Sequence, residues 1–147
     1  MKRVIATVDA PKAIGPYSQA VATGPWLFCA GQLPIVPESG ELITGDMGVQ
    51  TTRVLENLGG VLRANQMSYA HVVKTTVFLI DLDDFAAMNA VYAIFFPNLH
   101  PARSTVQVAA LPKGARIEIE AIAVSDLPPQ SPSTLGAPID ISPASPF

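Results

Sequence analysis

The sequence predicts an α/β (α+β) fold in which two helices cover one face of a mixed β-sheet. Apolar residues recur at three- and four-residue spacing over residues 46–64 and again over residues 81–96, which is typical of amphipathic helices. Short stretches rich in β-branched and aromatic residues precede, separate and follow these two segments. The predicted element order is therefore β-β-β-α-β-α-β-β, and 147 residues suffice for one domain with its own core.

Three short strands are predicted before the first helix, at residues 4–7, 18–23 and 26–30. Gly24 and Pro25 separate the second strand from the third, and both residue types favour a tight turn. We therefore expect these two strands to form a hairpin.

The first predicted helix begins after Asp46, whose side chain can accept a hydrogen bond from the first turn. Asn65 suits the left-handed residue that ends many helices. Gly59 and Gly60 lie inside the helix, and each costs about 1 kcal/mol relative to alanine. We expect this pair to permit close packing against the sheet.

The second predicted helix begins after Asp81 and follows a strand at residues 72–79 that is rich in valine and threonine. Two further strands, at residues 103–109 and 116–125, complete the sheet. Because both helices are expected on one face, the other face, which is still apolar, is expected to need a partner chain.

Residues 1–126 thus form a single predicted domain, and residues 127–147 differ from it in composition. The final segment is rich in serine and contains one acidic residue. It contains six prolines, Pro128, Pro129, Pro132, Pro138, Pro143 and Pro146. This composition predicts a disordered or polyproline-II-like tail.

The chain is poor in charge, with 14% charged and 49% hydrophobic residues. We expect a subunit interface to bury the surplus apolar surface. The net charge is −3 and no basic run is present, which argues against binding to nucleic acid or to an anionic membrane. Glycine and proline interrupt the uncharged segment 13–37 every few residues, so no membrane-spanning helix is expected there.

Cys29 is the only cysteine, so no disulfide can form within the chain. Residues 1–3 lead into a strand interrupted by polar residues and not into an apolar block, so no signal peptide is expected. Both features predict a cytoplasmic protein.

Three charged residues stand out in the last two predicted strands. In an extended strand Arg103 shares a face with Thr105 and Gln107, and Glu118 shares a face with Glu120. If the two strands pair, the guanidinium and a carboxylate could border one pocket. A guanidinium binds a carboxylate in a planar fork, and a nearby glutamate can orient water or move a proton. A plain arginine–glutamate ion pair at an interface explains the spacing equally well.

Other reactive side chains give weaker signals. Tyr17 follows Gly-Pro in a loop and is more simply a packed aromatic. Gly31 ends a strand where a ligand could approach backbone N–H groups. Cys29 has no partner base at motif spacing and reads as a buried strand residue. His71 and His100 are too few and too scattered for a metal site.

Several motifs in order resemble the YjgF-type reactive intermediate deaminase (Rid) family, and specifically its archetypal imine deaminase branch. The resemblance covers about residues 3–125. The motifs are AIGPYSQA at 13–20, AGQLP at 30–34, Gln50 with LENL at 55–58, VKTTVFL at 73–79, Asp84-Phe85 through Asn89 to Tyr92, PARS at 101–104, LPK at 111–113 and IEIE at 117–120.

The resemblance implies a chorismate-mutase-like subunit that assembles as a homotrimer, with ligand sites between subunits. It also implies hydrolysis of 2-enamines and 2-imines, such as 2-aminoacrylate/2-iminopropanoate and 2-iminobutanoate, to 2-keto acids and ammonia. Enzymes that use pyridoxal phosphate release such intermediates from serine or threonine. No cofactor is implied for this chain.

The resemblance also implies residue roles. Arg103 would bind the substrate carboxylate, assisted by the backbone N–H groups of Gly31 and Thr105. Glu118 would hold the attacking water, and Tyr17 would close the pocket.

Two positions depart from the family pattern. Family members often carry serine or threonine where this chain has Ala30, and many carry cysteine where it has Thr105. Alanine cannot offer the hydroxyl that contacts a ligand at that position, so rate and substrate range are open.

Three alternatives accompany the deaminase interpretation. The chain could act on another small enamine acid, such as 3-aminoacrylate, or form a trimer that binds small acids without turnover. An RNA-cleaving or translation-inhibiting protein is a third alternative, which the acidic charge balance disfavours.

Overall fold

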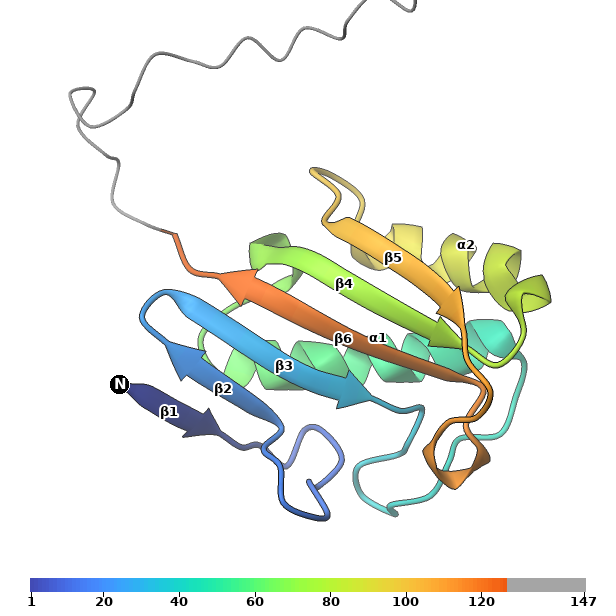
Figure 1. Cartoon of the computed structure of the whole chain (residues 1–147), viewed down its shortest axis with the longest axis horizontal. Helices are drawn as coiled ribbons and strands as arrows, with labels where there is room; N and C mark the ends of the chain where they lie inside the picture. The colour runs from blue at the N-terminus through green and yellow to red at the C-terminus, as the bar shows by residue number, and fades with distance from the viewer. Residues whose placement is uncertain (127–147) are drawn as a thin grey trace, which may run out of the picture.

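The computed structural model describes residues 1–126 and contains one six-stranded sheet and two α-helices (Figure 1). The elements are β1 (Lys2–Ile5), β2 (Ala20–Thr23), β3 (Trp26–Gln32), α1 (Met47–Ala64), β4 (Val72–Leu79), α2 (Phe85–Phe95), β5 (Ala102–Gln107) and β6 (Ile117–Val124). Short 3-10 turns occur at Tyr69–His71, Leu82–Asp84 and Pro112–Gly114. The predicted element order is confirmed.

The strands lie in the order β1-β2-β3-β6-β4-β5. All neighbours are antiparallel except β4 and β5, which α2 connects as a parallel pair. Strand β4 therefore separates β5, which carries Arg103, from β6, which carries Glu118. The suggestion that these two strands pair is wrong, because a parallel crossover through a helix places β5 beyond β4 at the edge of the sheet.

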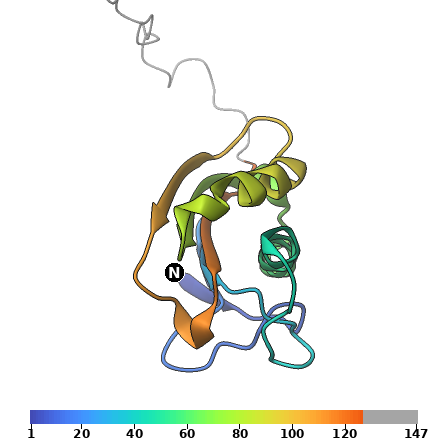
Figure 2. The same ribbon diagram turned by 90° about the vertical axis from the view of Figure 1, so that its right-hand side faces the viewer.

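Both helices lie on the same side of the sheet, as predicted (Figure 2). Alternate residues of β6 determine what each face of the sheet carries. The side chains of Ile117 and Ile119 are fully buried beneath the helices, while Glu118 and Glu120 point to the opposite, open face. Although β6 is a central strand, both of its glutamates thus point away from the core.

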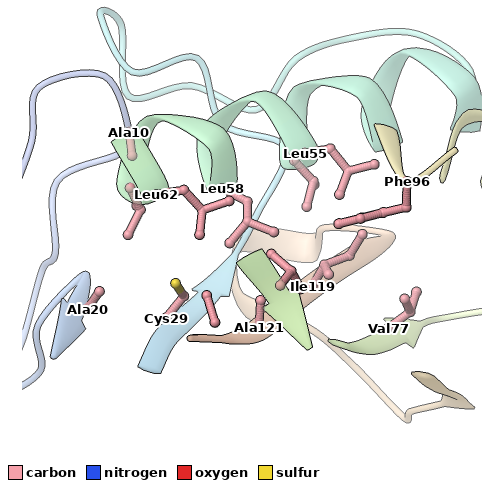
Figure 3. Packing of buried hydrophobic residues seen from close by; sticks show 14 of the residues in the cluster. Ala10, Ala20, Cys29, Leu55, Leu58, Leu62, Val77, Phe96, Ile119 and Ala121 are labelled. Carbon is pink, nitrogen blue, oxygen red and sulfur yellow. The ribbon is translucent and has the colours of Figure 1, made fainter. Parts of the chain in front are cut away.

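The core lies between α1 and the sheet, and α2 closes one end of it (Figure 3). Leu55, Leu58 and Leu62 of α1 face strand residues that include Ile119, and Phe96 packs beside them. Burying a leucine of this kind contributes about 1.5–3 kcal/mol. This packing holds α1 firmly over the central strands.

The ends of the helices differ from expectation in detail. Asp46 Oδ1 accepts a hydrogen bond from the Val49 N–H at 2.9 Å, so the predicted cap is confirmed. The left-handed residue after α1 is Gln66, with φ 58°, and not Asn65. Asp81 caps the 3-10 turn that precedes α2, so α2 itself begins four residues later, at Phe85.

Gly59 and Gly60 do permit close packing, but not against the sheet. A Cβ at Gly59 would overlap the Tyr69 hydroxyl, which donates to the Leu55 carbonyl at 2.6 Å. A Cβ at Gly60 would lie 2.5 Å from the backbone oxygen of Asp9. Gly59 therefore lets Tyr69 pack closely against α1, and Gly60 does the same for the loop that contains Asp9.

The open face carries exposed apolar side chains, as the composition suggested. Trp26 and Phe28 project from β3 with their ring centroids 6.5 Å apart, and both are more than two-fifths exposed. Val106 is similarly exposed on the edge strand β5. The sheet thus offers an apolar surface on the side that the helices leave free.

Two further sequence predictions concern the proline-rich segment and the membrane. The proline-rich segment 127–147 lies outside the residues that the structure describes. Neither helix within residues 1–126 is long and apolar enough to cross a membrane.

Candidate functional site

A cavity of about 550 Å³ lies where three loops meet the ends of β3 and β6. Four of the residues singled out in the sequence line it: Tyr17, Ala30, Gly31 and Glu118. The loops come from residues 7–19, 33–45 and 108–116, so the fold assembles this cavity from distant parts of the chain. Arg103 and Thr105 are not among the residues that line it.

Glu118 lies directly over Gly31. A Cβ at position 31 would overlap Oε1 of Glu118 and lie 2.8 Å from its Cδ. Real Cβ atoms do not approach other atoms this closely, so a side chain at position 31 would displace the Glu118 carboxyl group from its place. The sequence suggested that a ligand might need this glycine, whereas in the structure the carboxyl group of Glu118 occupies the space above it.

Glu118 is half-buried, and burial raises the pKa of its carboxyl group. The nearby negative charge of Glu120 raises this pKa further. No ion pair within residues 1–126 involves Glu118. An arginine–glutamate ion pair inside one chain is therefore not what these residues form.

Arg103 lies on the helix-facing side of β5, beneath α2. Its Nη1 donates a hydrogen bond to Asn89 Oδ1 at 2.7 Å. Its guanidinium carbon lies 4.7 Å from the ring centroid of Tyr92 and 5.4 Å from that of Phe85. These three residues lie at positions i, i+4 and i+7 of α2, so one face of the helix fixes the guanidinium.

Tyr92 is itself fixed. Its hydroxyl forms a buried hydrogen bond of 2.7 Å with Thr75 Oγ1 on β4. Burial raises the pKa of Tyr92 above its already high ordinary value, so at neutral pH the buried hydrogen bond to Thr75 joins two neutral hydroxyl groups. Phe85 and Tyr92 look like ordinary core residues in the sequence, and Asn89 has no signal beyond its place in a motif.

The two charged residues are far apart in one chain. Arg103 lies opposite Thr75 of β4, and Glu118 lies opposite Phe78. Three residues along a strand and two strand spacings each correspond to about 10 Å. In addition, Arg103 and Glu118 project from opposite faces of the sheet. One chain therefore does not bring them together.

The remaining predicted residues flank these two groups. Thr105 lies two residues after Arg103 and on the same face, with its Oγ1 buried and without a partner within the described chain. Ala30 lines the cavity, and its N–H donates to the Gln19 carbonyl at 2.9 Å. Tyr17 borders the cavity with 55% of its surface exposed, which is unlike a packed aromatic.

Two buried amides that sequence reasoning missed hold the cavity walls. Asn57 of α1 is fully buried and donates to the carbonyls of Leu33 at 3.0 Å and Ile35 at 2.8 Å. Gln19 accepts from the Thr7 N–H at 2.7 Å and donates to the Pro11 carbonyl at 2.8 Å. Each amide fixes one loop that lines the cavity, because a buried backbone carbonyl requires a partner.

The other reactive side chains take no part in the cavity. Cys29 is buried on the helix-facing side of β3, and burial raises the pKa of its thiol to about 12. It is therefore a packing residue, as predicted. Among residues 1–126 no group of three or more His, Cys, Asp or Glu side chains could hold a metal ion.

Comparison with known proteins extends over this whole described region. The family model described as Endoribonuclease L-PSP matches residues 7–125. A RutC family protein of Pyrococcus horikoshii is 53% identical over 126 residues, which make up 86% of this chain and 100% of that protein. The 2-iminobutanoate/2-iminopropanoate deaminase of Homo sapiens is 47% identical over 124 residues, 84% of this chain and 90% of that protein.

A solved structure agrees with these sequence matches. The crystal structure of Escherichia coli TdcF with bound serine superposes with a TM-score of 0.81 at 45% sequence identity. The match covers 84% of this chain and 99% of that one. The similarity thus includes the sheet, both helices and the loops that form the cavity.

Proposed function

The chain belongs to the endoribonuclease L-PSP (YjgF/Rid) family, and from that premise we propose that it is a 2-iminobutanoate/2-iminopropanoate deaminase. The reaction is the hydrolysis of 2-enamine or 2-imine acids, such as 2-aminoacrylate/2-iminopropanoate and 2-iminobutanoate, to 2-keto acids and ammonia. Relatives from human, goat, mouse and cattle that carry this name are 47–48% identical to the chain. The observation that carries the proposal is an arginine fixed to receive a carboxylate, together with an unpaired glutamate in a cavity.

The proposal includes a homotrimer with sites between subunits. One chain places Arg103 and Glu118 on opposite faces of its sheet, so each copy holds two incomplete half-sites. A neighbouring copy whose strand β5 lies against the cavity would supply the missing half. The apolar open face and the exposed edge of β5 give such an assembly a surface to bury.

In the proposed site Arg103 of one subunit binds the substrate carboxylate as a planar fork. The N–H groups of Gly31 and Thr105 assist Arg103 by donating hydrogen bonds to the oxygen atoms of the substrate. Ala30 borders the cavity in which the substrate lies. Tyr17, which is exposed at the cavity, covers the bound acid. These contacts hold C2 of the imine in front of Glu118.

Glu118 then moves the protons. Water attacks C2 while the carboxylate of Glu118 takes one of its protons. Glu118 passes this proton to the imine nitrogen, so that C2 carries a hydroxyl and an amino group. Glu118 then takes the hydroxyl proton and delivers it to the amino group, the C–N bond breaks, ammonia leaves, and the oxygen becomes the keto oxygen. The raised pKa of Glu118 makes it a better proton acceptor than an ordinary carboxylate. Water is the nucleophile and no electrons are transferred, so the reaction requires no cofactor.

The test is to trap the imine. An amino acid oxidase generates 2-iminopropanoate from alanine in the presence of semicarbazide, and the deaminase competes with the trap. We expect the wild-type chain to lower semicarbazone formation and Arg103→Ala to abolish most of that effect, by at least about 100-fold in kcat/KM, because a charge-assisted bidentate contact is lost. An Arg103→Ala variant that folds normally and competes as well as wild type would overturn the assigned role.

The same assay separates the alternatives. Faster turnover of 3-aminoacrylate than of 2-imines would favour a relative acting on another enamine acid, and pyruvate binding without turnover would favour a non-catalytic binder. The name of the family model, Endoribonuclease L-PSP, suggests RNA cleavage, but the net charge is −3 and the sequence lacks a basic run. RNA cleavage that persists through purification and vanishes in Arg103→Ala would favour that function instead. The cytoplasmic location remains a prediction from the single cysteine.

A further inference from the structure

Two lysines line the cavity in addition to Glu118. Lys12 belongs to the loop before β2, and Lys113 belongs to the turn before β6, so the two ammonium groups come from different walls. Each lysine follows a proline in the sequence. Within residues 1–126 neither ammonium group forms an ion pair with a carboxylate.

Both lysines are exposed at the edge of the cavity, and a hydrogen bond lies at or next to each of them. Lys113 has a φ of 59° and Gly114 has a φ of 71°, so two successive left-handed residues turn the chain at the cavity. Such a conformation is uncommon for a residue with a side chain. Lys113 Nζ lies 3.3 Å from the Gly40 carbonyl, on the loop across the cavity. Next to Lys12, the Pro11 carbonyl accepts a hydrogen bond from the buried Gln19.

The charge of the cavity is opposite to the charge of the chain. Lys12 and Lys113 give the lining two positive charges, and Glu118 is its only carboxylate. The chain as a whole carries a net charge of −3. A cavity with unpaired cations attracts anions. In the proposed reaction, however, Arg103 already binds the carboxylate next to the imine, so these cations have no assigned partner.

The cavity is also larger than a three- or four-carbon acid needs. Its volume of about 550 Å³ lies in the range of sites that hold much larger ligands. In one chain, before a neighbouring β5 lies against it, the cavity is thus wide enough for an acid with a longer side chain than 2-iminopropanoate. Because the two lysines are cationic, they favour a negatively charged group at the end of that side chain.

We propose that Lys12 and Lys113 form a subsite for a second carboxylate, so that the substrates include 2-imino dicarboxylic acids of four or five carbons. This inference rests on the proposed deaminase function and specifies the substrate class of the same site. Arg103 binds the carboxylate beside the imine, and the lysines bind the distal carboxylate. The chemical step at C2 is unchanged, and the second anionic group raises affinity and orients the chain of the substrate.

A competing explanation is that the lysines only steer anions toward the cavity. Steering acts on the encounter and raises the rate for every anionic substrate. A subsite acts on one group of the bound substrate and changes the preference between substrates. The quantity that separates the two is the ratio of kcat/KM for a dicarboxylic imine to kcat/KM for 2-iminopropanoate.

The experiment measures this ratio in Lys12→Gln, Lys113→Gln and the double variant. A flavin-dependent oxidase releases 2-iminosuccinate from aspartate and 2-iminopropanoate from alanine, and semicarbazide traps both. We expect the ratio to fall about fivefold in each single variant and about 20-fold in the double variant, as for loss of one partly exposed ion pair each. Lys2→Gln, which removes an exposed lysine far from the cavity in β1, should keep the wild-type ratio.

A binding measurement gives a readout without turnover. The wild-type chain should bind 2-oxoglutarate more tightly than 2-oxobutanoate, and the double variant should lose that preference. An unchanged ratio in the double variant, or an equal loss for both substrates, would overturn the subsite. If the wild-type chain turns over 2-iminopropanoate but the lysines do not alter the ratio, only this inference fails. If it accelerates no imine at all while still binding keto acids, the proposed deaminase function fails instead.

Discussion

Two regions of the molecule differ in how firmly they hold their charged residue. One is the cavity at the ends of β3 and β6, and the other is the edge formed by β5 and α2. Arg103 at the edge is held by a hydrogen bond to Asn89 and by two aromatic rings. Glu118 in the cavity is half-buried, has a raised pKa, and forms no side-chain hydrogen bond within residues 1–126. In the proposed function this difference has a reason, since a group that binds the substrate is best fixed in advance, whereas a group that transfers protons must be free to change its charge.

The largest expected effect comes from removing the proton carrier. Glu118→Gln keeps the shape of the side chain but cannot accept a proton, so kcat should fall by about 10³-fold with little change in KM. Arg103→Ala should instead raise KM as well, because it removes the carboxylate receptor. Steady-state kinetics of the two variants on 2-iminopropanoate measure this contrast. Identical patterns in the two variants would break the distinction between a fixed and a free half-site.

The second effect concerns the glycine beneath Glu118. In Gly31→Ala the new Cβ would overlap the Glu118 carboxyl group and push it from its position. We expect a loss of about 100-fold in kcat/KM and a destabilisation of about 1–3 kcal/mol, as for other overpacked sites. Urea unfolding and imine trapping measure the two effects.

A matched glycine serves as the control for this prediction. Gly48 lies in α1, and a Cβ there would approach nothing closer than 3.3 Å. The nearest atom is Oδ1 of Asp46, which also caps α1, so Gly48→Ala should retain activity and change stability by no more than about 1 kcal/mol. Equal behaviour of the two alanine variants would contradict the assigned contact between Gly31 and Glu118.

A smaller effect is expected at the support of the arginine. Asn89→Leu removes the acceptor that holds Nη1 of Arg103, so the guanidinium gains freedom and KM should rise about tenfold with little change in kcat. Asn89→Asp keeps an acceptor and should restore most of the affinity. A drop in kcat alone would show that Asn89 does not act through the arginine.

The smallest effect is a displacement of the pH profile. Glu118 works as a base in its ionised form, so kcat/KM should fall on the acid side at a pH above the ordinary range for glutamate. Glu120→Gln removes the neighbouring negative charge, which lowers the pKa of Glu118 and moves this limb to lower pH. A limb that moves to higher pH, or not at all, would exclude this coupling.

The raised pKa of Glu118 also makes the stability of the folded chain depend on pH. Folding raises the pKa of Glu118, so the folded chain binds more protons than the unfolded chain between the two pKa values. Stability associated with this group is present below the unfolded pKa and is lost as pH rises through the folded pKa. Glu118→Gln should therefore stabilise the chain at neutral pH and have no such effect in acid.

Local sequence patterns were sufficient for the order of the elements and for a few of the residues that line the cavity. The alternation in β6 correctly placed the two glutamates on one face, since burial of every second residue fixes the register. The glycine signal at Gly31 also led to a residue that lines the cavity, whereas Tyr17 was placed there only by the family resemblance. These features depend on residues that are close together in the sequence, and sequence periodicity detects such local relations.

Pairing between distant elements was not visible in the pattern. Nothing in the spacing of Arg103 indicates that β5 lies beyond β4, because the position follows from the crossover through α2. Asn57 and Gln19 appeared in the sequence only as members of longer motifs, yet each is buried against loop carbonyls that lie 8–24 residues away along the chain. Their roles depend on long-range contacts, which a single sequence does not display.

The central claim is that Arg103 of one subunit works with Glu118 of another, and subunit mixing tests it most directly. Arg103→Ala and Glu118→Gln chains, each nearly inactive alone, are co-expressed with different tags, and the mixed trimers are isolated. If each site takes its arginine and its glutamate from different chains, the isolated mixed trimers should restore about a third of the wild-type activity, because one of the three sites in a mixed trimer then combines both intact residues. Activity that stays at the level of the separate variants, in trimers shown to contain both chains, would contradict the account.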